Sequence, residues 1–238
     1  MRAFTDMFAN HVVAACEAIV QPSLVAFYKA NEKQMPEQVG TGFLIAWNGR
    51  PAIVTAKHVL RGHKIDENHN DKFFFQNDRL LSLNEAEVTD VFYAREHDLA
   101  AFHADRIDMN RCLPADVLHN GSAKNSKLLT IHGYLARDFN RGGGGLFPTP
   151  FVYTNKEIDG GTDRLTMDYP KRKNRNPRSG KSVMSPIPRG LSGCPMMDSA
   201  ALFIGDVKIR GVFTDKPEFK GIGFGERSET VLALLNQM

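Results

Sequence analysis

Residues 40–59 read GTGFLIAWNGRPAIVTAKHV, and this stretch decides the fold class. Two short runs of apolar and β-branched residues, Gly42–Trp47 and Pro51–Thr55, lie on either side of the turn-forming pair Asn48-Gly49. The pattern predicts two short β-strands separated by a turn. The second strand leads directly into His58, which places a titratable side chain next to an apolar strand and makes it the first candidate functional residue.

Short β-prone runs continue along the chain, separated by Gly, Asn and Asp turns, without long helices between them. Helical spacing predicts a short helix over 4–19, ended by Pro22, and a helix over 228–235 with Ser228 as its N-cap. The expected class is therefore all-β, with a helix near each end. The other predicted strands cover 24–28, 72–75, 88–92, 127–131, 151–153, 165–167, 201–204 and 209–213.

Length and composition are those of an ordinary globular protein. The 238 residues are 42% hydrophobic and 24% charged, which excludes disordered and collagen-like chains. The polar stretch 104–126 is the natural boundary between two halves. We predict an N-terminal helical segment over 1–22, a first β domain over 23–112 and a second over 113–238.

The three cysteines are an odd number and form no CxxC pair, so we expect reduced thiols in a cytoplasmic protein. No run reaches eighteen apolar residues and the N-terminus lacks a signal peptide's pattern, so neither a membrane span nor secretion is expected. The formal net charge of +3 is too small to indicate a nucleic-acid partner for the whole chain.

Two further fragments each place polar groups beside an apolar strand: HDLAAF at 97–102 and PRGLSGCP at 188–195. A serine hydroxyl becomes an effective nucleophile when a base removes its proton and a carboxylate orients that base. Ser192, His58 and Asp98 supply these three groups. We therefore predict them as the catalytic residues of a nucleophilic site.

The glycines around the candidate nucleophile have a physical role. Gly190 can present its N–H to a developing oxyanion without a Cβ in the way, and Gly193 leaves the tight turn sterically free. We predict the N–H groups of Gly190 and Ser192 as the oxyanion hole.

The order His58, Asp98, Ser192 resembles that of the chymotrypsin-like (trypsin-fold) serine peptidases, and within them the disulfide-free bacterial HtrA-like branch most of all, without its PDZ domain. The resemblance extends from about Val13 onward. It implies two six-stranded antiparallel β-barrels, with His58 and Asp98 on the first, Ser192 on the second and the site between them. It also implies a serine endopeptidase that acts on a protein or peptide substrate through an acyl-enzyme.

The resemblance further implies a substrate pocket walled by two strands that follow the nucleophile. The residue six before Ser192, at the pocket base, is Pro186, so an acidic group for binding Lys or Arg is missing. We expect cleavage after a small or medium apolar residue. The predicted pocket residues are Pro186, Ile209, Gly211, Val212, Phe213 and Phe224. The chain departs from the family pattern at Cys194, usually Gly, and at Lys57, commonly a small residue.

Several alternatives stay open. Asp90 is a second candidate for orienting His58, and Cys194 is a second candidate nucleophile. The same residues also suit esterase or transferase chemistry. A catalytically latent pseudopeptidase that binds extended peptides without cleaving them is the alternative function.

Metal and cofactor sites receive little support from the sequence. His63, His69 and Asp71 lie close together, but the stretch HKIDENHND is better explained as a solvated loop. Gly180-Lys181-Ser182 lacks the first glycine of a phosphate-binding loop, where Arg175 stands. We predict no metal and no cofactor.

Residues 171–181 read KRKNRNPRSGK, with six Lys or Arg among eleven positions. This composition predicts a solvated surface loop. The sharper hypothesis is that the loop docks an acidic partner or substrate segment and gates activity. The lack of interleaved aromatic residues argues against nucleic acid as that partner.

Overall fold

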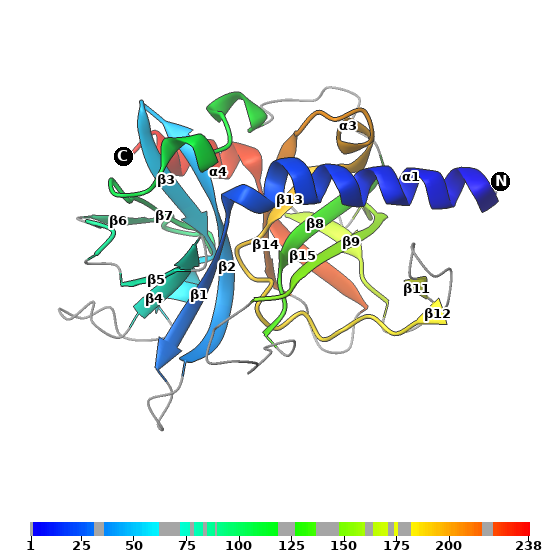
Figure 1. The fold of residues 1–238 in the computed structure, drawn as a ribbon, viewed down its shortest axis with the longest axis horizontal. Coiled ribbons are helices and arrows are strands. Elements are labelled where there is room, and N and C mark those ends of the chain that lie inside the picture. The colour runs from blue at the N-terminus through cyan, green and yellow to red at the C-terminus, as the bar shows by residue number, and fades with distance from the viewer. Residues whose placement is uncertain are drawn as a thin grey trace.

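The computed structural model describes residues 2–30, 36–61, 72–76, 79–82, 85–88, 90–118, 127–136, 148–159, 164–170, 174–175, 182–215 and 221–238. Two antiparallel sheets and a few short helices make up the molecule (Figure 1). The first helix continues as a π-helical turn over Cys16–Val20 and a 3-10 turn over Gln21–Ser23, where proline ends it as expected. The helices are α1 (Arg2–Ala15), α2 (Lys57–Arg61), α3 (Ser199–Phe203) and α4 (Ser228–Leu235).

The first sheet has seven strands in the described parts of the chain, one more than expected, in the order β5-β4-β1-β2-β3-β7-β6. Trp47 of β2 pairs with Arg50 of β3, and Asn48 and Gly49 between them have φ of 49° and 76°. Both turn residues are thus left-handed, as a tight two-residue hairpin requires. The strands are β1 (Leu24–Ala30), β2 (Pro36–Trp47), β3 (Arg50–Thr55), β4 (Lys72–Gln76), β5 (Arg79–Ser82), β6 (Val91–Tyr93) and β7 (Ala100–His103).

The second sheet has six strands among the residues that the structure describes, in the order β10-β15-β14-β13-β8-β9. It curls so that its two outer strands approach each other at one bridge, Glu157 with Met167, where the N–H of Ile158 donates to the carbonyl of Thr166 at 2.9 Å. A separate pair, β11 (Asn174–Arg175) and β12 (Ser182–Val183), precedes β13. The strands are β8 (Leu128–Tyr134), β9 (Pro150–Lys156), β10 (Leu165–Asp168), β13 (Pro195–Asp198), β14 (Ile209–Asp215) and β15 (Ile222–Arg227).

The buried apolar side chains form three clusters. One belongs to the first sheet and contains Leu44, Ile53 and Phe102; one belongs to the second and contains Ile131 and Met167. The third is shared by both sheets, α1 and α4, and includes Phe43, Val54, Ile209, Val212 and Leu235. Because this shared core joins the two halves, residues of both sheets are held in a fixed relation where the halves meet.

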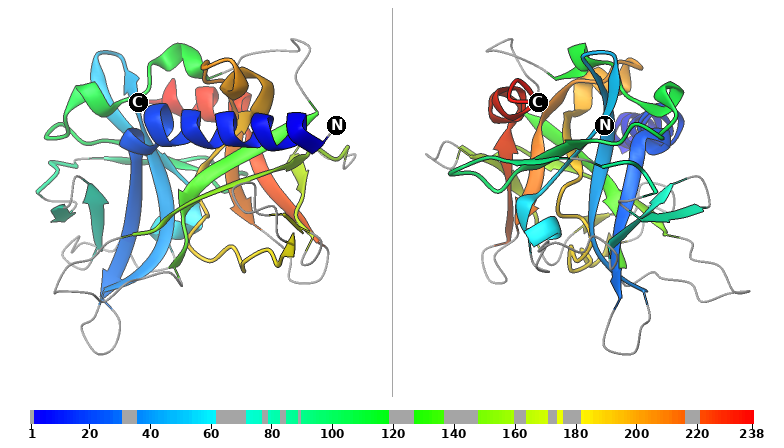
Figure 2. Two further views of the ribbon diagram at one scale, coloured as in Figure 1. Left: turned by 45° about the vertical axis from the view of Figure 1, so that its right-hand side comes forward. Right: turned by 90° about the vertical axis from the view of Figure 1, so that its left-hand side faces the viewer.

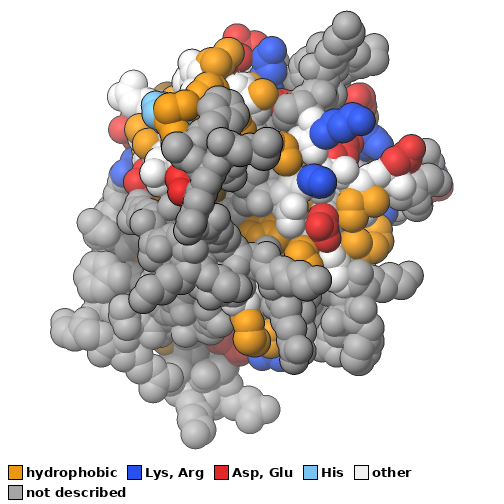
Figure 3. Space-filling model, turned by 90° about the vertical axis from the view of Figure 1, so that its right-hand side faces the viewer, with side chains coloured by type: hydrophobic (Ala, Val, Ile, Leu, Met, Phe, Trp, Pro, Cys, Tyr) orange, Lys and Arg blue, Asp and Glu red, His pale blue; other side chains and the backbone are white. Residues whose placement is uncertain are grey.

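The N-terminal helix is attached to the second half through α3. The views in Figures 1 and 2 show α1 lying across the strands of the second sheet, and Phe8 stacks on Phe203 with ring centroids 5.1 Å apart. Met7 and Ile204 remain exposed at this contact, and Figure 3 shows exposed hydrophobic side chains on this face of the molecule. The described helices contain none that is long and apolar enough to cross a membrane.

The predicted strand over 201–204 is wrong, because this apolar run forms helix α3. The Asp198 carboxylate accepts hydrogen bonds from the N–H groups of Ala200 and Ala201 at 2.9 and 3.1 Å, and so caps the helix. Helix α4 begins at Ser228 itself, with Arg227 at the cap position, rather than after a Ser228 cap.

His132 in β8 is fully buried, and burial lowers its pKa to about 4 although the backbone of Cys16 opposes the shift. In the unfolded chain the imidazole of His132 binds a proton below about pH 6.5, whereas in the folded chain it stays neutral down to about pH 4. Stability is therefore lost as the pH falls through this window. We expect His132 to cost the protein about 2 kcal/mol of unfolding free energy at pH 4.5 relative to pH 7.

Urea unfolding at the two pH values tests this expectation. His132→Leu should lose less stability than the wild type on going from pH 7 to pH 4.5, whereas His11→Leu, at an exposed position, should behave like the wild type. Equal pH dependence in the wild type and His132→Leu would contradict the expectation.

Candidate active site

His58 lies at the second position of α2, just after β3 ends. The preceding residue, Lys57, ties this helix to the loop between β6 and β7: its backbone N–H donates to the carbonyl of Asp98 at 3.2 Å and its Nζ to the carbonyl of Ala94 at 2.8 Å. The side chain of Lys57 therefore has a structural role. It holds the loop of Asp98 against α2, the helix that carries His58.

Asp98 holds His58 with both carboxylate oxygens. Oδ2 lies 2.6 Å from Nδ1 of His58, and Oδ1 accepts from the backbone N–H of His58 at 2.9 Å. Burial by itself would raise the pKa of Asp98, but the hydrogen bonds and charge of His58, together with the charge of Arg164, outweigh it and hold the pKa below its usual value. An ionised carboxylate on Nδ1 leaves Nε2 as the atom able to accept a proton. Asp90, the alternative orienting residue, is exposed.

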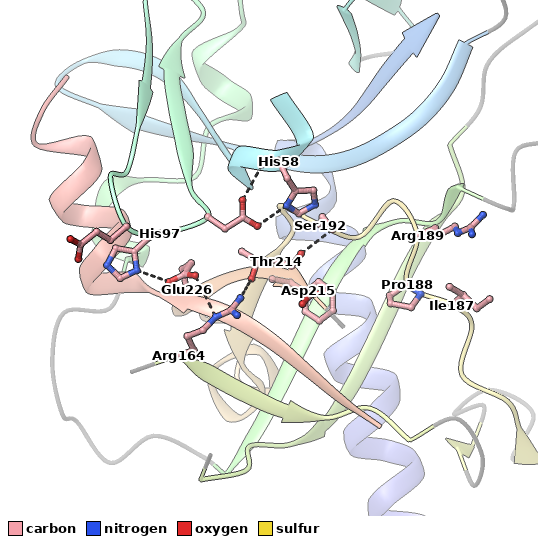
Figure 4. A pocket seen from close by; sticks show the side chains of 13 residues that line it. His58, His97, Arg164, Ile187, Pro188, Arg189, Ser192, Thr214, Asp215 and Glu226 are labelled. Carbon is pink, nitrogen blue, oxygen red and sulfur yellow. Dashed lines mark hydrogen bonds and ion pairs between the residues drawn. The ribbon is translucent and has the colours of Figure 1, made fainter. Parts of the chain in front are cut away.

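Ser192 lies in the turn before β13, and its carbonyl accepts from the N–H of Thr41 in β2 at 2.8 Å. Its hydroxyl donates to the carbonyl oxygen of Thr214 at 3.1 Å (Figure 4). No hydrogen bond joins the described side chains of Ser192 and His58. The structure thus brings the three predicted catalytic residues into one cavity, with the His58–Asp98 pair formed and the serine hydroxyl directed to Thr214.

Two carbonyl contacts set the orientation of the predicted oxyanion hole. The carbonyl of Arg189 accepts from the N–H of Ala136 at 2.9 Å, and that of Leu191 accepts from the N–H of Cys194 at 3.0 Å. In a trans peptide the N–H points opposite to the carbonyl, so the N–H groups of Gly190 and Ser192 point away from these contacts. Within the described chain neither N–H donates to another residue.

Thr41 fixes this turn to the first sheet. Its fully buried hydroxyl donates to the carbonyl of Gly190 at 2.6 Å and accepts from the N–H of Tyr134 at 3.1 Å. Nε2 of Gln38, on the same strand, donates to the carbonyl of Tyr134 at 2.8 Å. These contacts join β2 to the turn of Ser192 in the second half. Neither residue was predicted from the sequence, because both lie in the polar stretch PEQVGT at 36–41, which gives no sign that their side chains are buried.

A cavity of about 750 Å³ contains the catalytic candidates. In Figure 4, Ile187, Pro188 and Arg189 lie to the right of Ser192, whereas His97, Glu226 and Arg164 lie to the left. The lining therefore has a charged side and a mixed side, in which Ile187 and Pro188 are apolar and Arg189 is basic. The lining residues are His58, Glu96, His97, Asp98, Arg164, Ile187, Pro188, Arg189, Ser192, Phe213, Thr214, Asp215 and Glu226.

The predicted pocket residues are placed differently from the expectation. Of the six, Phe213 lines the cavity. Ile209 and Val212 are fully buried in the shared core, and the backbone of Gly211 lies against that of Glu226 on the neighbouring strand. The side chains at 209 and 212 both enter the core, although they are three positions apart, because the pairing of β14 with β13 shifts register at Arg210. These three residues are therefore not placed to contact a substrate.

The two remaining pocket candidates also lie outside the lining. Pro186 is buried and its carbonyl accepts from the hydroxyl of Tyr169 at 3.2 Å, while the guanidinium of Arg164 lies over the ring of Phe224. The exposed apolar group at the cavity is instead Ile187, which is 66% exposed. Of the residues named for the expected apolar pocket, Phe213 is the one in the lining, and Ile187 is an apolar lining residue that was not predicted.

The alternative nucleophile is chemically unsuited. Cys194 is fully buried, and burial raises the pKa of its thiol far above the usual value. All three cysteines are free thiols. Among the described residues no group of three His, Cys, Asp or Glu side chains is arranged to hold a metal ion. The metal candidates His63, His69 and Asp71 lie outside the described residues, and so does most of the basic stretch 171–181.

Comparison with models of known protein families finds no match for this chain, and comparison with curated proteins finds none either. The function of the chain is therefore inferred from the geometry of its site.

Proposed function

We propose that the chain is a serine hydrolase of the chymotrypsin-like class, and more particularly an endopeptidase that acts through an acyl-enzyme. The observation that carries the proposal is the two-point contact of Asp98 with His58 in the cavity that also contains Ser192. Acyl transfer needs a serine nucleophile, a histidine whose Nδ1 is oriented by a carboxylate, and backbone N–H groups that can bind the oxyanion. Ser192, His58 with Asp98, and the N–H groups of Gly190 and Ser192 are the candidates for these parts.

The proposed reaction begins when Ser192 turns from Thr214 toward His58. Nε2 of His58 takes the hydroxyl proton while Oγ bonds to the substrate carbonyl carbon, and the oxyanion is bound by the N–H groups of Gly190 and Ser192. When the C–N bond breaks, the leaving amine takes the proton from His58. Water then attacks the ester carbonyl carbon while His58 takes a proton from it. The bond between the carbonyl carbon and Oγ breaks, His58 returns the proton to Oγ, and the carboxylic acid product leaves.

The direction of the Ser192 hydroxyl favours a second candidate. Because the hydroxyl donates to Thr214 and not to His58, the described state lacks an activated nucleophile. This observation supports a latent peptide-binding module that is gated by a partner, with the basic stretch 171–181 as the proposed docking segment.

Labelling with a fluorophosphonate distinguishes an active serine hydrolase from the latent peptide-binding module. In the reaction Oγ of Ser192 bonds to phosphorus and fluoride leaves, with His58 accepting the proton. We expect a mass adduct on Ser192 in the wild type and none in Ser192→Ala or His58→Ala. A folded wild type that takes no label, yet binds extended peptides, would overturn the hydrolase proposal in favour of the latent module.

A further inference from the structure

A charged network lies on the left side of the cavity in Figure 4 and connects the two halves of the molecule. Nδ1 of His97, in the loop that carries Asp98, lies 2.9 Å from Oε2 of Glu226 in β15. The other oxygen of Glu226 lies 3.4 Å from Nε of Arg164, which directly precedes β10. Glu226 is 5% exposed, so its carboxyl group is buried, and His97 and Arg164 are its contacts there.

Arg164 also reaches the residue that holds the nucleophile. Its Nη2 donates to Oγ1 of Thr214 at 2.5 Å, and its guanidinium lies 5.1 Å from the centre of the Phe224 ring. The carbonyl of Thr214 in turn accepts the hydroxyl of Ser192. Arg164 thus contacts Glu226, Phe224 and Thr214. Through its bond to Oγ1 of Thr214 it holds in place the residue whose carbonyl accepts the Ser192 hydroxyl.

The charge of Arg164 also acts on the other end of the site, because it helps to keep the pKa of Asp98 low. Arg164 is therefore linked to Ser192 by contact and to Asp98 by charge. The titratable or charged side chains around Asp98 are Lys57 and His58 of α2, Glu96 and His97 of its own loop, and Arg164, Asp215 and Glu226 of the second half.

We propose that Arg164 is a positioning residue for the catalytic residues, which keeps Thr214 and the strand β14 in place beside the turn of Ser192 and supplies a positive charge that acts on Asp98. Glu226 holds Arg164 in place, and His97 ties this arrangement to the loop of Asp98. The inference rests on the proposed function, because the arrangement has a consequence for rate only if Ser192 and His58 react.

The test measures the second-order rate of fluorophosphonate labelling against pH, which needs no knowledge of the natural substrate. The acidic limb of such a profile reports the loss of the neutral base. In Arg164→Met we expect a rate about 10-fold to 100-fold lower, because Thr214 loses the contact that keeps it beside the turn of Ser192. We also expect the midpoint of the acidic limb to move to higher pH, because the lost cation no longer helps to hold the pKa of Asp98 low.

Two further variants separate charge from geometry. Arg164→Lys keeps the cation but cannot bridge Thr214 and Glu226 with a planar fork, so we expect a lowered rate with a midpoint close to that of the wild type. Glu226→Gln removes a negative charge and should move the midpoint in the opposite direction, to lower pH. A merely structural role of Arg164 predicts no such opposite shifts.

Arg50→Met is the matched control. Arg50 forms an ion pair with Asp105 on the surface of the first half, outside the residues that line the cavity, and its removal should leave rate and midpoint unchanged. Wild-type midpoints in both Arg164→Met and Glu226→Gln would overturn the inference and leave the hydrolase proposal intact. A wild type that takes no label would overturn the proposed function, and the inference with it.

Discussion

Replacing Asp98 with asparagine is expected to lower turnover by about 10⁴-fold, the size that this change has in chymotrypsin-like enzymes. Asp98 accepts from both the ring and the backbone N–H of His58, and an asparagine side chain of the same shape would offer an amide that cannot stabilise the charged imidazole. The neutral side chain also favours the wrong tautomer, with the proton on the nitrogen that should face Ser192. Substrate affinity should change little, because Asp98 acts through His58.

Turnover of a peptide substrate, or the rate of fluorophosphonate labelling, measures the effect. Asp90→Asn is the matched control, since Asp90 was the alternative orienting residue in the sequence and is exposed in the structure. It should keep wild-type activity. A loss of less than 10-fold in Asp98→Asn would show that Asp98 does not orient the base.

Replacing Gly193 with alanine is expected to lower the unfolding free energy by about 3–5 kcal/mol and the labelling rate by 100-fold or more. Gly193 has φ of 93°, and an added Cβ would lie 1.9 Å from the carbonyl oxygen of Thr41 and 2.3 Å from Oγ1 of Thr55. Relief requires the Ser192 turn to move away from β2. This movement separates the nucleophile from His58, because the turn is bound to the first sheet at this point.

Gly205→Ala separates the steric clash from the cost of a left-handed conformation. Gly205 has φ of 79°, comparable to that of Gly193, but no atom lies within 4 Å of the added Cβ. We expect a loss of about 1–2 kcal/mol in urea unfolding and full labelling activity. Similar stability and labelling in Gly193→Ala and Gly205→Ala would refute the close packing of Gly193 against Thr41 and Thr55.

The strands and the catalytic candidates were predictable because local patterns encode them. The stretch from Gly40 to His58 shows the hairpin through its β-prone runs and Asn48-Gly49, and the turn of Ser192 shows itself through its glycines. The local pattern gave a wrong prediction where a short apolar run fits both a strand and a capped helix. The apolar run after Asp198 is compatible with a strand, and the cap formed by the Asp198 carboxylate decides for a helix.

The sequence by itself therefore determined most strands of the two sheets, though not β5 or β13, and the identity of His58, Asp98 and Ser192 as candidates. The tertiary structure decided how the site is held: Thr41 contacts Gly190, 149 positions away, and His97 contacts Glu226, 129 positions away. It also decided that Ile209 and Val212 face the core while charged residues line the cavity. The physical reason is that such contacts depend on how two sheets pack, and residues so far apart in the chain share no periodic pattern that reveals them.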